Sequence, residues 1–90
     1  MRAPKFSLGQ VVATPAALEV LADSDVRTAL ARHASGDWGE LDPADTAENE
    51  TSLTHGFRLL SAYTSAAGTK FWVITEADRS ATTVLLPSDY

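Results

Sequence analysis

The chain contains no cysteine, which excludes disulfide bonds, cysteine-ligated zinc, iron–sulfur clusters and thiol catalysis. Long apolar runs are also missing, because no stretch approaches the roughly 18 to 20 apolar residues that a membrane-spanning helix needs. The basic residues of the opening Met-Arg-Ala-Pro-Lys are not followed by the apolar segment of a secretory signal. We therefore expect a cytoplasmic protein that does not associate with a membrane.

Basic residues are scarce. Seven Lys and Arg are scattered among twelve Asp and Glu, and the net charge is −5. Because phosphate groups are bound by clustered cations, we do not expect direct nucleic-acid binding; a basic protein partner fits better, and a homodimer is left open. The sequence offers no nucleotide-binding loop, calcium loop, two-histidine metal helix or Ser-His-Asp order, so it predicts no cofactor and no metal, and it leaves catalytic residues unassigned.

What is present is the composition of one ordinary globular domain. The 90 residues are 44% hydrophobic and 21% charged. A chain of this length encloses one modest hydrophobic core and not two. We predict a single domain over residues 1–90.

The first third of the chain predicts a strand followed by two short helices. Residues 6–14 have the apolar pattern of a strand. Thr14 and Pro15 then form a helix start, a hydroxyl N-cap followed by proline at the first helical position. The buried side of this helix is expected at Ala17, Leu18, Leu21 and Ala22. After an interruption at residues 22–25, a second helix is expected to bury Val26, Ala29, Leu30 and His33.

A third helix is expected from the Asp-Pro start at residues 42–43 to His55, where Gly56 stops it. If Leu53 and Phe57 face the core, the amide of Asn49 faces it too. A buried amide needs hydrogen-bond partners.

The last third alternates as strands do, over residues 57–64, 70–76 and 81–86, with links of hairpin length between them. The middle strand is apolar on both faces at residues 71–74, so it is expected inside the sheet. The predicted fold is therefore α+β: an N-terminal strand, two or three short helices, and a three-stranded antiparallel meander.

Half of the acidic residues fall in one short segment. They are Asp37, Glu40, Asp42, Asp45, Glu48 and Glu50, with no Lys or Arg among them. Trp38 lies in this segment, between Asp37 and Gly39. An exposed indole there would anchor a protein interface, whereas an indole folded back would belong to the core.

Two further groups have both a functional and a structural interpretation. His33 with Asp37 and Glu40 could form a metal site or a general-base pair, or His33 could end its helix and hydrogen-bond the Gly-Asp-Trp-Gly turn. Asn49 with Glu50 could hold a substrate or satisfy the backbone of that loop.

The turn at residues 75–80 is the last candidate. Its Asp78 and Arg79 could grip a ligand beside Glu76, or could pair with each other at the surface. The candidate binding residues are thus His33, Asp37, Trp38, Glu40, Asn49, Glu76, Asp78 and Arg79.

Four strings carry a resemblance: LGQVVATP (residues 8–15), HASGDWGE (33–40), LLSAY (59–63) and WVITEADRS (72–80). With Leu85-Leu86-Pro87 and Tyr90, they extend over nearly the whole chain. On these residues the chain resembles a family of small uncharacterised proteins of bacterial plasmids and other mobile elements, labelled plasmid-related and sometimes type I restriction subunit M-like. The resemblance implies an accessory protein of a mobile element and assigns no mechanism.

Two functional hypotheses follow. In the first, the protein is a non-catalytic binding protein of a mobile element, whose acidic segment with Trp38 docks on a protein partner such as a host-defence or DNA-handling protein. In the second, it is a small-ligand enzyme or a nuclease, because its order of elements is similar to the RelE/ParE toxin scaffold; a ribonuclease would use Arg58, Lys70, Arg79 and Tyr63. The acidic charge favours the first hypothesis, since such nucleases need a cationic face for RNA.

Overall fold

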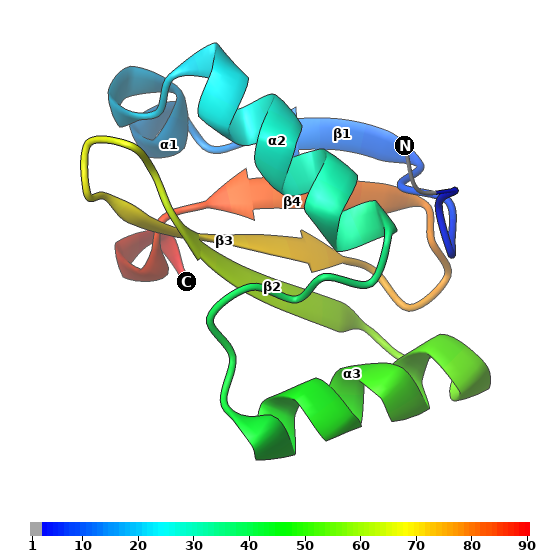
Figure 1. Cartoon of the computed structure of the whole chain (residues 1–90). Coiled ribbons are helices and arrows are strands. Elements are labelled where there is room, and N and C mark those ends of the chain that lie inside the picture. The colour runs from blue at the N-terminus through cyan, green and yellow to red at the C-terminus, as the bar shows by residue number, and fades with distance from the viewer. Residues whose placement is uncertain (1–2) are drawn as a thin grey trace.

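The computed structural model describes residues 3–90 and has the predicted α+β architecture (Figure 1). Along the chain lie β1 (Gln10–Ala13), α1 (Pro15–Val20), α2 (Asp23–Ala34), α3 (Pro43–His55), β2 (Leu59–Thr64), β3 (Lys70–Thr75), β4 (Ala81–Leu85) and a 3-10 turn, η1 (Pro87–Asp89). The order of the elements and the antiparallel meander of the last three strands are confirmed.

The four strands form one sheet in the order β1-β4-β3-β2. The pairs β2–β3 and β3–β4 are antiparallel, and β1 lies parallel to β4. The middle strand of the meander is therefore interior, as expected. β1 and β2 are the two edges, so the N-terminal strand lies at the opposite side of the sheet from β2 and α3.

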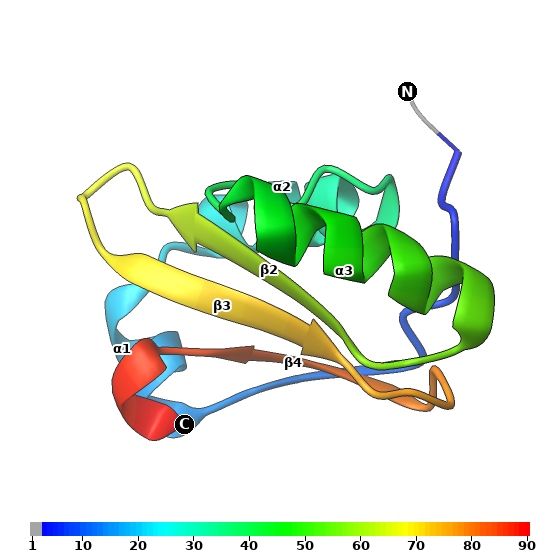
Figure 2. The ribbon, with the colours of Figure 1, turned by 90° about the horizontal axis from the view of Figure 1, so that it is seen from below.

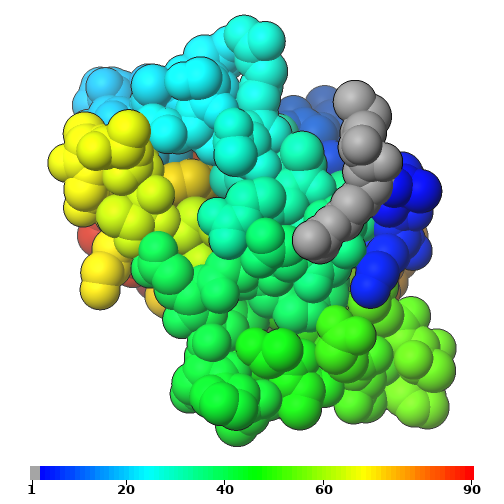
Figure 3. Space-filling view, viewed as in Figure 1, coloured from blue at the N-terminus to red at the C-terminus, as the bar shows by residue number. Residues whose placement is uncertain are grey.

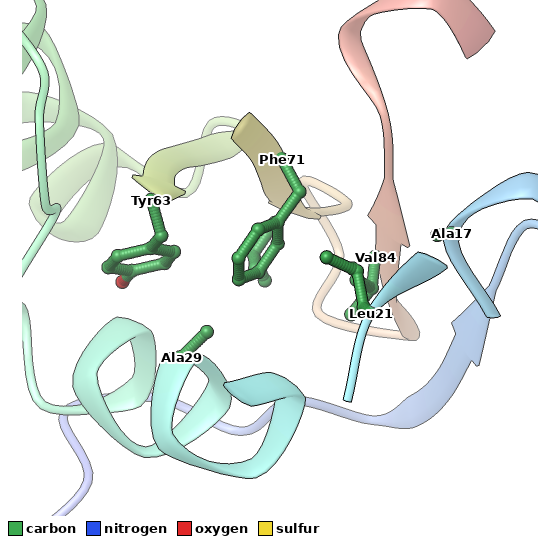
Figure 4. Packing of buried hydrophobic residues seen from close by; sticks show 7 residues of the cluster. Ala17, Leu21, Ala29, Tyr63, Phe71 and Val84 are labelled. Carbon is green, nitrogen blue, oxygen red and sulfur yellow. The ribbon is translucent and has the colours of Figure 1, made fainter. Parts of the chain in front are cut away.

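One face of the sheet carries the core. Because side chains alternate along a strand, Phe71, Val73 and Thr75 of β3 point to this face, which α2 covers (Figures 1 and 2). The core cluster consists of Ala17, Leu21, Ala29, Tyr63, Phe71, Val73 and Val84 (Figure 4). Two small helices thus suffice to bury the large residues of three strands.

The other face is covered by side chains and by the C-terminal turn. Trp72 and Ile74 of β3 point to this face, and the ring of Tyr90 meets the Trp72 ring edge-on, with 5.6 Å between centroids. The guanidinium of Arg58 lies 5.7 Å from the centre of the Tyr90 ring. Figure 2 shows no α-helix lying across this face.

α1 and α3 begin where the sequence predicts, whereas α2 already begins at Asp23, inside the expected interruption, and its N-cap Ala22 makes no side-chain hydrogen bond. Thr14 Oγ1 accepts from Ala17 N at 3.2 Å, and Asp42 Oδ1 accepts from Asp45 N at 2.8 Å, so both N-caps are formed. α3 ends at Gly56. Within residues 3–90, no helix has the length and apolar character required to cross a bilayer.

Three further local expectations are wrong. The first strand begins at Gln10 and not at residue 6, because Gly9 turns the chain with φ 63° against the backbone of Ser80. Leu18 is 67% exposed, since the six-residue α1 buries only Ala17. Phe57 is 58% exposed, because the chain has already left α3 before it.

Candidate functional site

His33 is fully buried beneath α2 and reaches two strands. Its Nδ1 lies 2.5 Å from Ser61 Oγ of β2, and its Nε2 lies 2.9 Å from Thr75 Oγ1 of β3. Thr75 Oγ1 lies 2.7 Å from Thr82 Oγ1 of β4, which donates to the backbone oxygen of Leu8 at 2.7 Å. One chain of polar groups therefore connects α2, three strands and the segment before β1.

The direction of each hydrogen bond in this chain follows from its last acceptor. The carbonyl of Leu8 only accepts, so the single hydroxyl proton of Thr82 is used there and Thr82 must accept from Thr75. Thr75 in turn accepts from His33, which places the imidazole proton on Nε2. Nδ1 is then the acceptor for the Ser61 hydroxyl. The network is fully satisfied only by the neutral imidazole.

Burial, together with the smaller effect of the nearby charge of Arg79, lowers the pKa of His33 to about 4. His33 is therefore uncharged at neutral pH. Ser61 beside it has the pairing of a nucleophile and a base, but both side chains are fully buried. Neither lines any of the three main surface hollows, so a substrate does not reach this pair.

The proposed metal or general-base site at His33, Asp37 and Glu40 is not formed. Both ring nitrogens of His33 are engaged with strand hydroxyls, so the side chain does not bind the Gly-Asp-Trp-Gly turn; only the backbone oxygen of His33 does, accepting from Gly36 N at 3.1 Å. Within residues 3–90, no three His, Cys, Asp or Glu side chains are placed to hold a metal ion together.

The indole of Trp38 is folded back into the core and is not exposed on the loop. It is 4% exposed, its ring lies 6.2 Å from that of Phe6 and 5.6 Å from that of His33, and its Nε1 donates to Glu50 Oε2 at 2.6 Å. The indole therefore joins α3 to the core and is not an exposed interface anchor.

The loop that contains Trp38 covers the outer edge of β2. Glu40 N donates to Ala62 O at 2.8 Å, and Ala62 N donates to Trp38 O at 3.2 Å. Two residues earlier on β2, Leu60 N donates to Asn49 Oδ1 at 3.1 Å, and Asn49 Nδ2 donates to Leu60 O. The buried amide of Asn49 thus acts on a strand backbone and not on the loop; of the predicted pair, it is Glu50 that binds the loop.

This contact leaves no room for a side chain at Gly39. A Cβ there would lie 2.0 Å from Ala62 O and 2.7 Å from a ring carbon of Tyr63, and the backbone has φ 75°. Glycine is needed at this position for both reasons.

Asp37 and Glu40 fasten the same loop from outside. The side-chain carboxylate of Asp37 accepts a hydrogen bond from Arg32 Nε at 2.7 Å. The backbone carbonyl of Asp37 accepts one from Tyr63 Oη at 2.6 Å. The hydrogen bond to Asp37 raises the pKa of Arg32, and burial raises that of Tyr63 to about 12. Glu40 Oε1 accepts from Thr64 Oγ1 at 2.9 Å.

Arg79 neither pairs with Asp78 nor points to a ligand hollow. Its guanidinium donates to the carbonyl oxygens of Phe57 at 2.7 Å and Ser52 at 3.1 Å, and so binds the end of α3. Asp78 Oδ1 accepts from Ser80 N at 3.0 Å, and its hydrogen bonds to Ser80 lower its pKa. Glu76 is exposed, and its backbone oxygen accepts from Arg79.

The eight candidate residues therefore do not meet in one concave site. Most of them hold α3 and its loop against β2. The residues of the nuclease hypothesis do not gather either: Tyr63 is buried, Arg79 is engaged with α3, and Arg58 lies beside Tyr90.

A hollow of about 430 Å³ is present where α3 meets β2. Its lining is Leu41, Asp45, Glu48, Asn49, Thr51, Ser52, Phe57, Arg58 and Leu60. Of the candidates, only Asn49 takes part. Sequence reasoning placed Asp45 and Glu48 in an acidic segment but did not place Arg58 and Leu60 opposite them, because that requires the packing of α3 on the strand edge.

Sequence reasoning also missed the hydroxyl partners of His33. Ser61 lies between Leu59 and Tyr63 at the period of two that marks the buried face of a strand. Polar residues at such positions were the available signal for a buried polar network.

Comparison with protein-family models, with curated proteins and with solved structures finds no match to this chain.

Replacing Gly39 with alanine is expected to lower the free energy of unfolding far more than replacing Gly68. Both glycines have positive φ, which costs an alanine about 1 to 2 kcal/mol, but only at Gly39 does the new Cβ meet a backbone oxygen. Urea unfolding followed by circular dichroism measures the difference. Equal losses in the two variants would show that the loop does not press on β2.

The stability of the protein is expected to fall as the pH drops from about 6.5 to about 4. In this window the unfolded chain protonates His33 while the folded protein, whose pKa is about 4, does not. The full difference between the pKa of His33 in the unfolded and in the folded protein corresponds to a change of about 3 kcal/mol in the free energy of unfolding.

Urea titrations at several pH values check this. His33→Gln should flatten the dependence in that window, whereas the same change at the exposed His55 should preserve it. A slope that survives His33→Gln would assign the effect to other groups.

Proposed function

We propose that the protein is a non-catalytic binding protein, which docks a basic segment of a protein partner in the hollow between α3 and β2. The observation that carries the proposal is the combination, in this one hollow, of acidic side chains without a cation partner and an apolar floor. The mobile-element context implied by the resemblance belongs to the same proposal, and the partner would then be a host-defence or DNA-handling protein.

The acidic side of the hollow comes from α3. Asp45 and Glu48 are three residues apart, so they lie on the same face of the helix. In the described part of the chain, the ion pairs are Arg27–Asp23 and Arg32–Asp37, and neither involves α3. A basic segment would supply the counter-charge that Asp45 and Glu48 lack.

The apolar side comes from the loop and from β2. Leu41 and Leu60 are half-buried in the hollow, and Phe57 at its rim is 58% exposed. Exposed aromatic rings next to a polar rim are typical of protein-binding surfaces. Arg58 also lines the hollow, but one cation against two carboxylates leaves it acidic.

The buried cluster has a positioning role in this proposal. Trp38 holds Glu50, Asn49 holds the Leu60 backbone, and Arg79 holds the end of α3. Together they keep the acidic helix at a fixed distance from Leu60. Trp38 therefore acts by placing the docking surface and not by touching the partner.

Charge reversal at Glu48 tests the proposal against a matched control. Glu48→Lys and Glu19→Lys change the net charge equally, but Glu19 lies on α1, away from the hollow. We expect a protein captured from bacterial extract on the immobilised wild type to be retained by Glu19→Lys and reduced about tenfold or more on Glu48→Lys.

Quantitative mass spectrometry of the captured proteins gives the readout, and added salt should lower the retention. Equal capture by the two variants, or no protein retained by the wild type above an uncoupled matrix, would overturn the proposal. Trp38→Ala is unsuitable here because it would disturb the core.

A further inference from the structure

The two edges of the sheet are treated differently. The backbone of β2 at Leu60 and Ala62 is hydrogen-bonded by Asn49 and by the loop around Trp38. At the other end, β1 pairs with β4 on one side, and no strand among residues 3–90 pairs with its second side. Only one of the two edges is therefore closed by the chain itself.

The unpaired groups on β1 can be named from its register. Gln10 N donates to Ser80 O and Thr14 N donates to Val84 O, both on the β4 side. Because backbone direction alternates along a strand, the N–H and C=O groups of Val11 and Ala13 point away from β4. The free edge thus presents two donors and two acceptors.

The side chains around this edge lack charge, which is one of the usual protections. Free edges in soluble proteins are kept very short or carry charges, prolines or bulges that prevent pairing with another chain; β1 is short, with four residues, and Pro15 follows it. Here residues 6–18 contain no charged side chain, in a chain with nineteen Asp, Glu, Lys and Arg. Val11 is 44% exposed and Val12 is 40% exposed.

Exposed apolar residues concentrate at the same place. Among residues 3–90, the large apolar side chains that are exposed are Val11, Val12, Leu18, Val20, Phe57 and Tyr90, and four of the six belong to β1 and α1.

We propose that β1 pairs antiparallel with β1 of a second copy of this chain and joins two sheets into one of eight strands. An antiparallel pair about a twofold axis is self-complementary, so the same four backbone groups satisfy one another. The register that uses all of them places Val11 opposite the partner's Ala13 and gives four hydrogen bonds.

In this register Val12 lies opposite Val12 of the partner subunit, in the closer type of antiparallel pair. The β-branched side chains then cover each other on the face of the sheet that carries Trp72. Direct contact between identical β-branched residues is a favourable cross-strand pair.

Charge favours a second copy at this edge in spite of the net charge of −5. Half of the acidic residues lie in residues 37–50, around the far edge of the sheet. Figure 3 shows α3 at one end of the molecule and α1 at the other. With a strand spacing of about 4.8 Å, the two β2 strands of the dimer would be roughly 34 Å apart, well beyond the screening length of about 8 Å.

Sedimentation velocity over a concentration series up to about 1 mM tests the dimer, because a short strand edge gives a weak interface. We expect the wild type to approach twice the 9.6 kDa mass of the chain. Val12→Lys should raise the dissociation constant about tenfold or more, since it places like charges opposite each other. The control, Val20→Lys on α1, should remain as dimeric as the wild type.

Mixing two oppositely charged variants distinguishes a loss of strand pairing from misfolding of the variants. Val12→Lys and Val12→Glu should each be monomeric, and mixing them should restore the dimer, because Lys then lies opposite Glu. A monomeric wild type at about 1 mM, a dimer that survives both single variants, or a mixture that stays monomeric would each overturn the proposal. Loss of the dimer in Val20→Lys would also overturn it, by placing the contact on α1.

Discussion

The structure depends on a neutral imidazole at the junction of its two layers. His33 is the only side chain of α2 that hydrogen-bonds to two strands, and each of its nitrogens has one fixed role. Thr75 donates in turn to Thr82, and Thr82 donates to the Leu8 carbonyl. This series of hydrogen bonds links the position of α2 to the position of the segment before β1. A satisfied buried network of this kind specifies one packing arrangement more strictly than apolar contacts alone.

A second consequence of this junction is the place of α3. The helix has few apolar residues and contacts the sheet mainly through β2. Trp38 packs on His33 and holds Glu50, and Arg79 reaches Ser52 from the β3–β4 turn. A polar helix is thereby held at a strand edge by side-chain hydrogen bonds, and its outer face stays available for contacts with other molecules.

The sequence predicted the elements of the fold better than their contacts. The helix starts at Thr14 and Asp42 were readable because capping is local, and the meander was readable from its alternation. The late start of the first strand at Gln10 was not, since it depends on how Gly9 turns the chain against the backbone of Ser80.

The candidate residues were recognised as unusual, but their partners were not. Asn49 was expected inside because of its position on α3, yet Leu60 as its partner follows only from the packing of α3 along β2. Arg79 was expected at the surface beside Asp78, whereas its left-handed backbone, with φ 62°, directs the side chain to α3. Tertiary geometry decided these cases.

The loop at Gly39 also determines how the sheet can grow. Since it occupies β2 together with Asn49, any added strand has to join at β1. When a sheet has a single edge that can accept a strand, the first pairing with another chain leaves no edge for a second one. Such a chain can cap a partner's sheet, but it cannot propagate strand by strand into a fibre, and the glycine that admits the loop is therefore also a barrier against polymerisation.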